Sequence, residues 1–155
     1  MDARDAAKVA LEALHFNNSL VQFADQKAAT LIVINSIFIA SVGGPADPLR
    51  AACLGFSVLS LLCCLLVIRA RRDPFDKEPH DVVFFGDILP LKNGRGYFVT
   101  LASQTPTALA EGLAARVYRT CTIARRKYRC YGWALKLSFA ATPLWIATML
   151  LGGLR

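Results

Sequence analysis

The sequence has few charged residues, and most of those it has are basic. Among 155 residues only 19% are charged, whereas about 25% is usual for a soluble domain, and 55% are hydrophobic. The sequence has 11 acidic residues and 18 Lys and Arg residues, which gives a formal net charge of +7. The composition argues against a soluble enzyme, and the length favours one domain. The basic excess implies an anionic partner, and membrane lipid headgroups already qualify.

The sequence also lacks the patterns of catalytic and metal sites. It contains no G-x-S-x-G, H-E-x-x-H or G-x-x-x-x-G-K motif. Its five cysteines form no C-x-x-C pair, so we predict reduced thiols, with neither a disulfide nor a zinc site. Glu78, His80, Asp81 and Asp87 match no metal-ligand spacing. We therefore predict a protein that is not an enzyme and that needs no metal or cofactor.

Three long apolar segments are present instead, at residues 28–44, 51–68 and 133–151. Each approaches the roughly 17 to 25 residues that a membrane helix needs. Gly and Pro residues between the first two segments suit a tight reversal. A soluble fold would leave too little polar surface to cover three such helices. We predict an all-α membrane protein with three transmembrane helices, whose cytoplasmic helical extensions form a small bundle.

The distribution of basic residues predicts the orientation, because Lys and Arg accumulate on the cytoplasmic side of membrane spans. Only Arg50 and Arg155 flank the other side. The residues on the basic side are Lys27, Arg69, Arg71, Arg72, Arg125, Arg126, Lys127 and Arg129. We expect a multi-pass protein of the bacterial inner membrane with a cytoplasmic amino terminus. Tyr128, Tyr131 and Trp133 lie where an aromatic belt would mark the inner boundary of the third span.

The remaining segments are predicted to be cytoplasmic. Residues 1–27 have apolar residues at helical spacing and no Gly or Pro after Asp5, so they predict a helix that continues into the first span. Residues 69–132 are assigned as a sensor segment with a basic helix, which begins at Thr105 and Pro106 and continues into the third span. Residues 71–96 contain many helix breakers and predict a linker with short turns, and its apolar residues 82–85 are expected to dock onto the two helices.

Three short passages together resemble a known family. They are ADQKA at residues 24–28 with Asn35 following, FFGDI at residues 84–88, and ARRKY at residues 124–128. Their order and spacing resemble the PycTM family, the transmembrane effectors of the bacterial Pycsar antiphage system. The resemblance covers roughly residues 15–150. It implies an effector that responds to cyclic CMP or cyclic UMP, made by a cyclase on infection, by impairing the membrane and stopping growth of the infected cell.

The basic residues of the second cytoplasmic helix are the main ligand candidates. Arg116, Arg119, Arg126 and Lys127 gather on one arc of this helix, at about 100° per residue. This face has three interpretations: a solvated or lipid-facing surface, a phosphate site, or, least favoured, a nucleic-acid site. With the resemblance, the phosphate site becomes a cyclic nucleotide site. Gly86 could expose backbone amides to a phosphate, and Asp87 could accept a hydrogen bond from a ribose or base.

Four further residues are candidates for structural or gating roles. Asp25 and Lys27 could be ligand groups, but their depth favours an ion pair of Asp25 with Arg126 or Lys127. Asn35 lies inside a span, where an amide needs a partner on another helix. Pro143 weakens the third span because it cannot donate a backbone hydrogen bond. We expect a homo-oligomer that binds no nucleic acid. The alternative function is a small pore-forming or structural membrane protein without a ligand.

Overall fold

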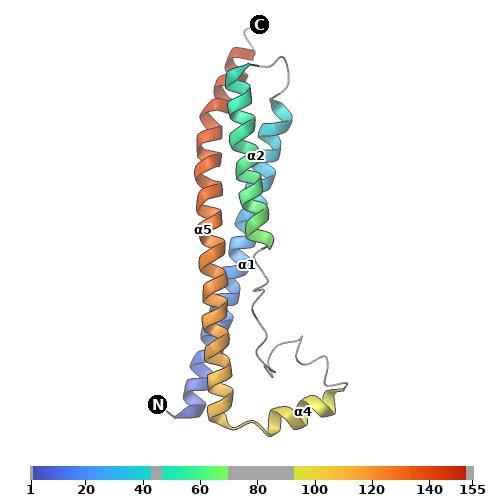
Figure 1. The fold of residues 1–155 in the computed structure, drawn as a ribbon, viewed down its shortest axis with the longest axis vertical. Helices are drawn as coiled ribbons and strands as arrows, with labels where there is room; N and C mark the ends of the chain where they lie inside the picture. Colours follow the sequence, from blue (N-terminus) through green and yellow to red (C-terminus); the bar gives the residue numbers. More distant parts are fainter. Residues whose placement is uncertain (1, 43–46, 70–92, 153–155) are drawn as a thin grey trace. The chain divides into compact units, whose positions relative to one another are not determined.

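The computed structural model describes residues 2–42, 47–69 and 93–152, and these residues are almost entirely helical. Within these ranges the chain forms four α-helices and no strands (Figure 1). They are α1 (Ala3–Ser41), α2 (Pro48–Arg69), α4 (Gly94–Ala102) and α5 (Pro106–Gly152). Three of them, α1, α2 and α5, are long and apolar enough to cross a membrane. The predicted fold class is confirmed, while the exact limits of the spans stay predictions.

Polar side chains at the helix starts explain where α2 and α5 begin. The Asp47 carboxylate accepts a hydrogen bond from the backbone N–H of Leu49 at 3.2 Å, directly before Pro48 opens α2. Thr105 does the same for α5, because its hydroxyl accepts from the N–H of Ala108 at 3.2 Å. The predicted start at Thr105 and Pro106 is therefore confirmed. Both long helices also continue without a break, as predicted, over 39 residues in α1 and 47 in α5.

The helix α4 corrects the prediction for the linker. Residues 71–96 were expected to form turns, and residues 70–92 lie outside the described residues, as does the predicted docking of residues 82–85. At the end of this stretch, however, a helix begins at Gly94. The side-chain oxygen of Asn93 accepts a hydrogen bond from the N–H of Gly96 at 2.8 Å. Asn93 is thus the N-cap of α4. Asparagine followed by glycine is common in turns, but asparagine is also favoured at helix N-caps.

The chain divides into two compact units. The first comprises Met1–Ser19 and Asp73–Thr122, and the second comprises Leu20–Arg72 and Ile123–Arg155. In the first unit Leu14 of α1 and Leu113 of α5 are buried, with 6% and 5% of their surface exposed. The Cys121 thiol also donates to the Asn17 side-chain oxygen at 3.3 Å. These residues place the two helices against one another within this unit.

The second unit is a bundle of α1, α2 and α5, which lie side by side (Figure 1). Its core consists mainly of small side chains, which allow helices to approach closely in a membrane. The buried members are Ala24, Ala28, Leu31, Cys64, Val67 and Ala134. Large apolar side chains point outward instead, including Val33 (59% exposed), Leu66 (53%) and Phe139 (69%). An apolar outer surface over a small-residue core is the arrangement expected of helices surrounded by lipid.

Candidate functional site

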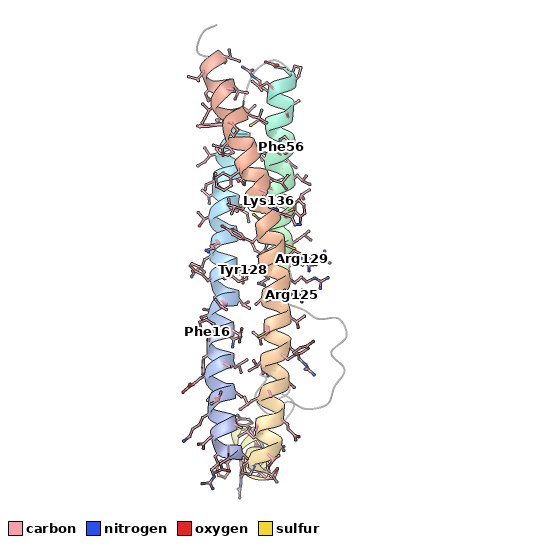
Figure 2. All side chains as sticks on the ribbon, turned by 90° about the vertical axis from the view of Figure 1, so that its left-hand side faces the viewer. Phe16, Phe56, Arg125, Tyr128, Arg129 and Lys136 are labelled. Atoms are coloured by element: carbon pink, nitrogen blue, oxygen red, sulfur yellow. The ribbon has the colours of Figure 1, made fainter. Side chains whose placement is uncertain are left out.

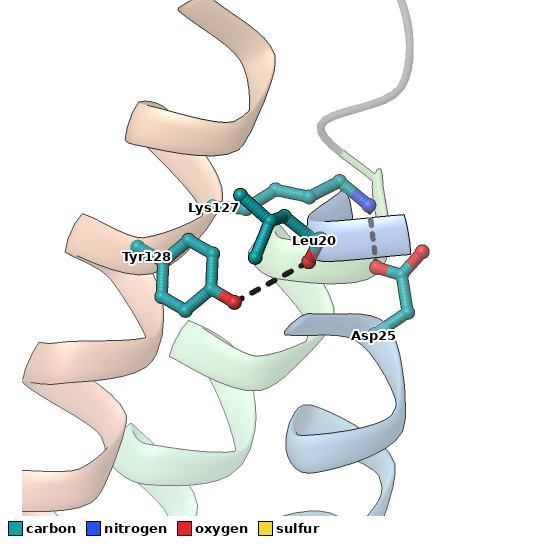
Figure 3. Close-up of polar contacts among 4 residues, drawn as sticks. All are labelled: Leu20, Asp25, Lys127 and Tyr128. Carbon is teal, nitrogen blue, oxygen red and sulfur yellow. Dashed lines mark hydrogen bonds and ion pairs between the residues drawn. The ribbon is translucent and has the colours of Figure 1, made fainter. Parts of the chain in front are cut away.

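A buried charged contact in the second unit joins α1 to α5. The Lys127 ammonium donates to the Asp25 carboxylate, and the two form an ion pair (Figure 3). The Lys127 side chain is fully buried and that of Asp25 is 17% exposed. Next to this pair, the Tyr128 hydroxyl donates to the backbone oxygen of Leu20 at 3.4 Å. The predicted ion pair of Asp25 is therefore present, with Lys127 as the partner.

A polar cluster lies inside the same bundle and links all three helices. We define it as Asn35 of α1, Ser60 of α2 and Ser138 of α5, all of them buried. The Asn35 amide nitrogen donates to the Ser138 hydroxyl at 2.8 Å and to the Ser60 hydroxyl at 3.2 Å. The two hydroxyls lie 2.8 Å apart, and Ser60 also donates to the backbone oxygen of Ala134 at 2.8 Å. The expectation that Asn35 needs a partner on another helix is confirmed.

One acceptor of this cluster has no partner. The Asn35 side-chain oxygen is buried and accepts no hydrogen bond from the described part of the chain. An unsatisfied amide oxygen in an apolar bundle is costly, more so than an unused hydroxyl at a surface. The polar cluster is therefore a place where the bundle would gain from water, or from a different arrangement of its helices.

The predicted ligand residues fall into different environments. Arg116 and Arg119 are half-buried on α5 in the first unit, whereas Arg126 is exposed on α5 in the second. Lys127 is buried against Asp25, so in this conformation it does not share an open face with Arg126. Gly86 and Asp87 lie outside the described residues. Binding of a ligand by any of these residues stays a prediction.

The predicted gating residues have structural contacts of their own. The Lys27 ammonium lies 4.3 Å from the centroid of the Phe23 ring and 5.9 Å from that of Tyr131, which is the geometry of cation–π contacts. Pro143 lies within α5, which continues through it. Near the last turns of the same bundle, the rings of Phe38 and Trp145 stack with their centroids 5.2 Å apart. Lys27 thus contacts aromatic residues of the bundle, whereas Pro143 is exposed on α5, and a gating role for either residue stays a prediction.

Sequence reasoning missed Ser60, although a signal for it was present. The buried face of α2 repeats at four and three residues, and its members are Cys53, Ser57, Ser60, Cys64 and Val67. Four of these five side chains are small and weakly polar. A face of that kind in an apolar helix is typical of close contact with neighbouring helices and of hydrogen bonds between them. Placing Ser60 beside Asn35 required the alignment of α1 and α2, which the sequence does not provide.

The comparison with known families decides the identity. The family model of the Pycsar effector protein domain, PycTM, matches residues 9–152. The chain belongs to this family. No curated protein and no solved structure matches it. This PycTM chain is thus an effector of antiphage defence with transmembrane helices, in a family that implies a membrane context and a cyclic nucleotide signal.

Proposed function

We propose that this PycTM protein binds a cyclic pyrimidine mononucleotide, cyclic UMP or cyclic CMP, and then impairs the inner membrane, causing abortive infection. The protein acts as a homo-oligomer and catalyses no reaction. The observation that carries the proposal is the continuity of α1 and α5, which pass without interruption from the first unit into the apolar second unit. A ligand that favours one arrangement of these helices in the first unit therefore acts on the spans directly.

Arg116 and Arg119 are the best candidates for phosphate contacts. They are three residues apart on α5, so they lie on neighbouring positions of one helix face, and both are half-buried in the first unit. The planar guanidinium group of arginine matches the oxygens of a phosphate with two parallel hydrogen bonds. Two guanidinium groups on one face suit a cyclic mononucleotide, whose single phosphate carries one negative charge.

The polar cluster is the proposed point of output. Asn35, Ser60 and Ser138 connect three spanning helices by hydrogen bonds that can be exchanged for water or for contacts with another copy. The unpartnered Asn35 oxygen lowers the cost of such a rearrangement, because it has no hydrogen bond to lose. Ligand binding then converts a closed bundle into one that exposes these groups along a shared wet interior.

A thermal-shift titration of the detergent-purified protein with cyclic UMP and cyclic CMP tests the proposal. Arg116→Gln with Arg119→Gln should abolish the ligand-induced rise in unfolding temperature. Arg4→Gln with Arg95→Gln removes the same charge from exposed positions in the first unit and should retain it. If both double variants lost the ligand-induced rise equally, the response would depend only on the net charge of the protein. Membrane leakage by the purified protein without any nucleotide response would favour the ligand-independent pore instead.

A further inference from the structure

A second basic face of α5 is not used by the proposed nucleotide response. It consists of Arg125, Arg129 and Lys136, all of them exposed in the second unit (Figure 2). At about 100° per residue these three side chains leave the helix within about 40° of one another. They follow one line along about 16 Å of the helix axis. The arc of Arg116, Arg119, Arg126 and Lys127 is a different one.

This basic face runs from the predicted membrane boundary into the apolar span. Trp133, which is 59% exposed, lies between Arg129 and Lys136. The Lys136 ammonium is 4.9 Å from the centroid of the Trp133 ring, so the charge is drawn back by one turn toward Arg129. A lysine that emerges from a lipid-facing helix is costly unless its charge reaches the headgroup region or meets an anion. The direction of its side chain fits both conditions.

The described part of the second unit offers little negative charge to this face. Among the described residues of the second unit only Asp25 and Asp47 are acidic. Asp25 pairs with Lys127. Asp47 caps α2, and Cys53 of α2, six residues after Asp47, contacts Ala141, which is five residues beyond Lys136 on α5. Neither of these two carboxylates, the only ones in the described part of the second unit, therefore serves as the counter-charge of this basic face.

Gly132 lies on the same line, between Arg129 and Lys136. A β-carbon at this position would meet no atom within 4 Å, so packing among the described residues does not require a glycine. Glycine in the middle of a helix is unfavourable relative to alanine. Its presence leaves a smooth surface beside three cations, next to the predicted inner boundary of the third span.

We propose that Arg125, Arg129 and Lys136 bind the headgroup phosphate of an anionic phospholipid, which rests on Gly132 and Trp133. The guanidinium groups bind the phosphate oxygens, the lysine ammonium approaches from the bilayer side, and an acyl chain follows the smooth surface at Gly132. The lipid fixes the depth of the third span in the membrane. This site depends on neither the cyclic nucleotide nor the direction in which the chain crosses the membrane.

The test is lipid binding by the purified full-length protein in uncharged detergent, measured by native mass spectrometry and by thermal unfolding. Phosphatidylglycerol should bind and raise the unfolding temperature, whereas phosphatidylcholine and inorganic phosphate at equal concentration should not. Arg129→Gln with Lys136→Gln should weaken phosphatidylglycerol binding at least tenfold. Arg4→Gln with Lys8→Gln removes one arginine and one lysine from exposed positions on α1 and should leave binding unchanged.

Two single variants separate the lipid site from general attraction. Gly132→Leu keeps the charge and should still weaken binding, because it fills the smooth surface, while Lys136→Arg should retain binding. Equal losses in the two double variants would show that only net charge matters and would overturn the site. If inorganic phosphate stabilised the protein as much as phosphatidylglycerol does, the site would bind a soluble anion and the lipid proposal would be overturned. Full binding by Gly132→Leu would overturn the predicted position of the acyl chain.

Discussion

The environment of a single side chain, Lys127, changes how the basic segment at residues 125–129 is interpreted. In the sequence it is one of four cations within residues 125–129, and the other three are Arg125, Arg126 and Arg129. In the structure Lys127 is fully buried, while these three arginines are exposed. A buried ammonium is tolerated only with a counter-ion, and Asp25 supplies it. Helical periodicity could place Lys127 on an arc with Arg126, but only the position of α1 determines that Lys127 is covered and Arg126 is not.

The ion pair leads to a prediction about stability. Asp25→Asn leaves a buried, uncompensated ammonium and should lower the free energy of unfolding by about 3 kcal/mol. Replacing both residues, Asp25→Asn with Lys127→Met, should recover most of that loss, because no buried charge remains. Thermal unfolding of the purified variants in detergent measures both effects. Asp5→Asn, at an exposed carboxylate in the first turn of α1, is the control and should change little. Additive losses in the double variant would contradict a coupled pair.

At the scale of whole helices, the sequence predicts well that the long helices are continuous, but it does not predict the short helix α4. The long α5 follows from an apolar stripe, the cap at Thr105 and the absence of proline between Pro106 and Pro143, all of which are local signals. The helix α4 was missed because Asn93, Gly94 and Gly96 are typical turn residues. Whether such a cluster ends a structure or caps the next one depends on the residues that follow, and here residues 97–102 continue a helix.

The cap of α4 can be tested directly. Asn93→Ala removes the hydrogen bond that the Gly96 N–H donates, which should cost the helix about 1 kcal/mol. Hydrogen exchange at residues 94–102 should accelerate by roughly fivefold as the helix frays, since that free energy corresponds to such a factor. Exchange in α5 should stay as it is. Asn18→Ala, at an exposed position within α1, is the matched control. Unchanged protection of residues 94–102 would show that packing, rather than the cap, holds α4.

At the scale of the whole molecule, hydropathy and family membership agree on a membrane effector, while the orientation rests on charge alone. The predicted cytoplasmic amino terminus can be tested by thiol labelling in intact cells, in a variant without the native cysteines. Pro48→Cys, at the start of α2, should react with a reagent that does not cross the membrane, and Thr107→Cys should react only after lysis. Both positions are exposed in the structure. The reverse pattern would invert the chain and place the arginines of the first unit outside the cell.

The polar cluster links this topology to the proposed output. Side-chain hydrogen bonds between helices in a membrane contribute only about 1 kcal/mol each, so the cluster does not hold the bundle together by itself. Its removal should therefore leave a folded protein, which makes it suitable for a functional test. Asn35→Leu removes the donor shared by Ser60 and Ser138, and also the unpartnered oxygen, while the two hydroxyls remain bonded to each other.

Dye-loaded liposomes containing the purified protein should release their dye when the nucleotide identified by thermal shift is added. Asn35→Leu should bind the nucleotide with unchanged affinity and lose most of the release, because an apolar side chain cannot line a wet interior. Ser36→Ala is the neighbouring control and should leak like the parent protein. Among the described residues, the exposed Ser36 hydroxyl bonds only to the backbone oxygen of Ile32 in its own helix. Full leakage in Asn35→Leu would remove the polar cluster from the output. Nucleotide binding without leakage in the parent protein would mean that the spans act on another partner.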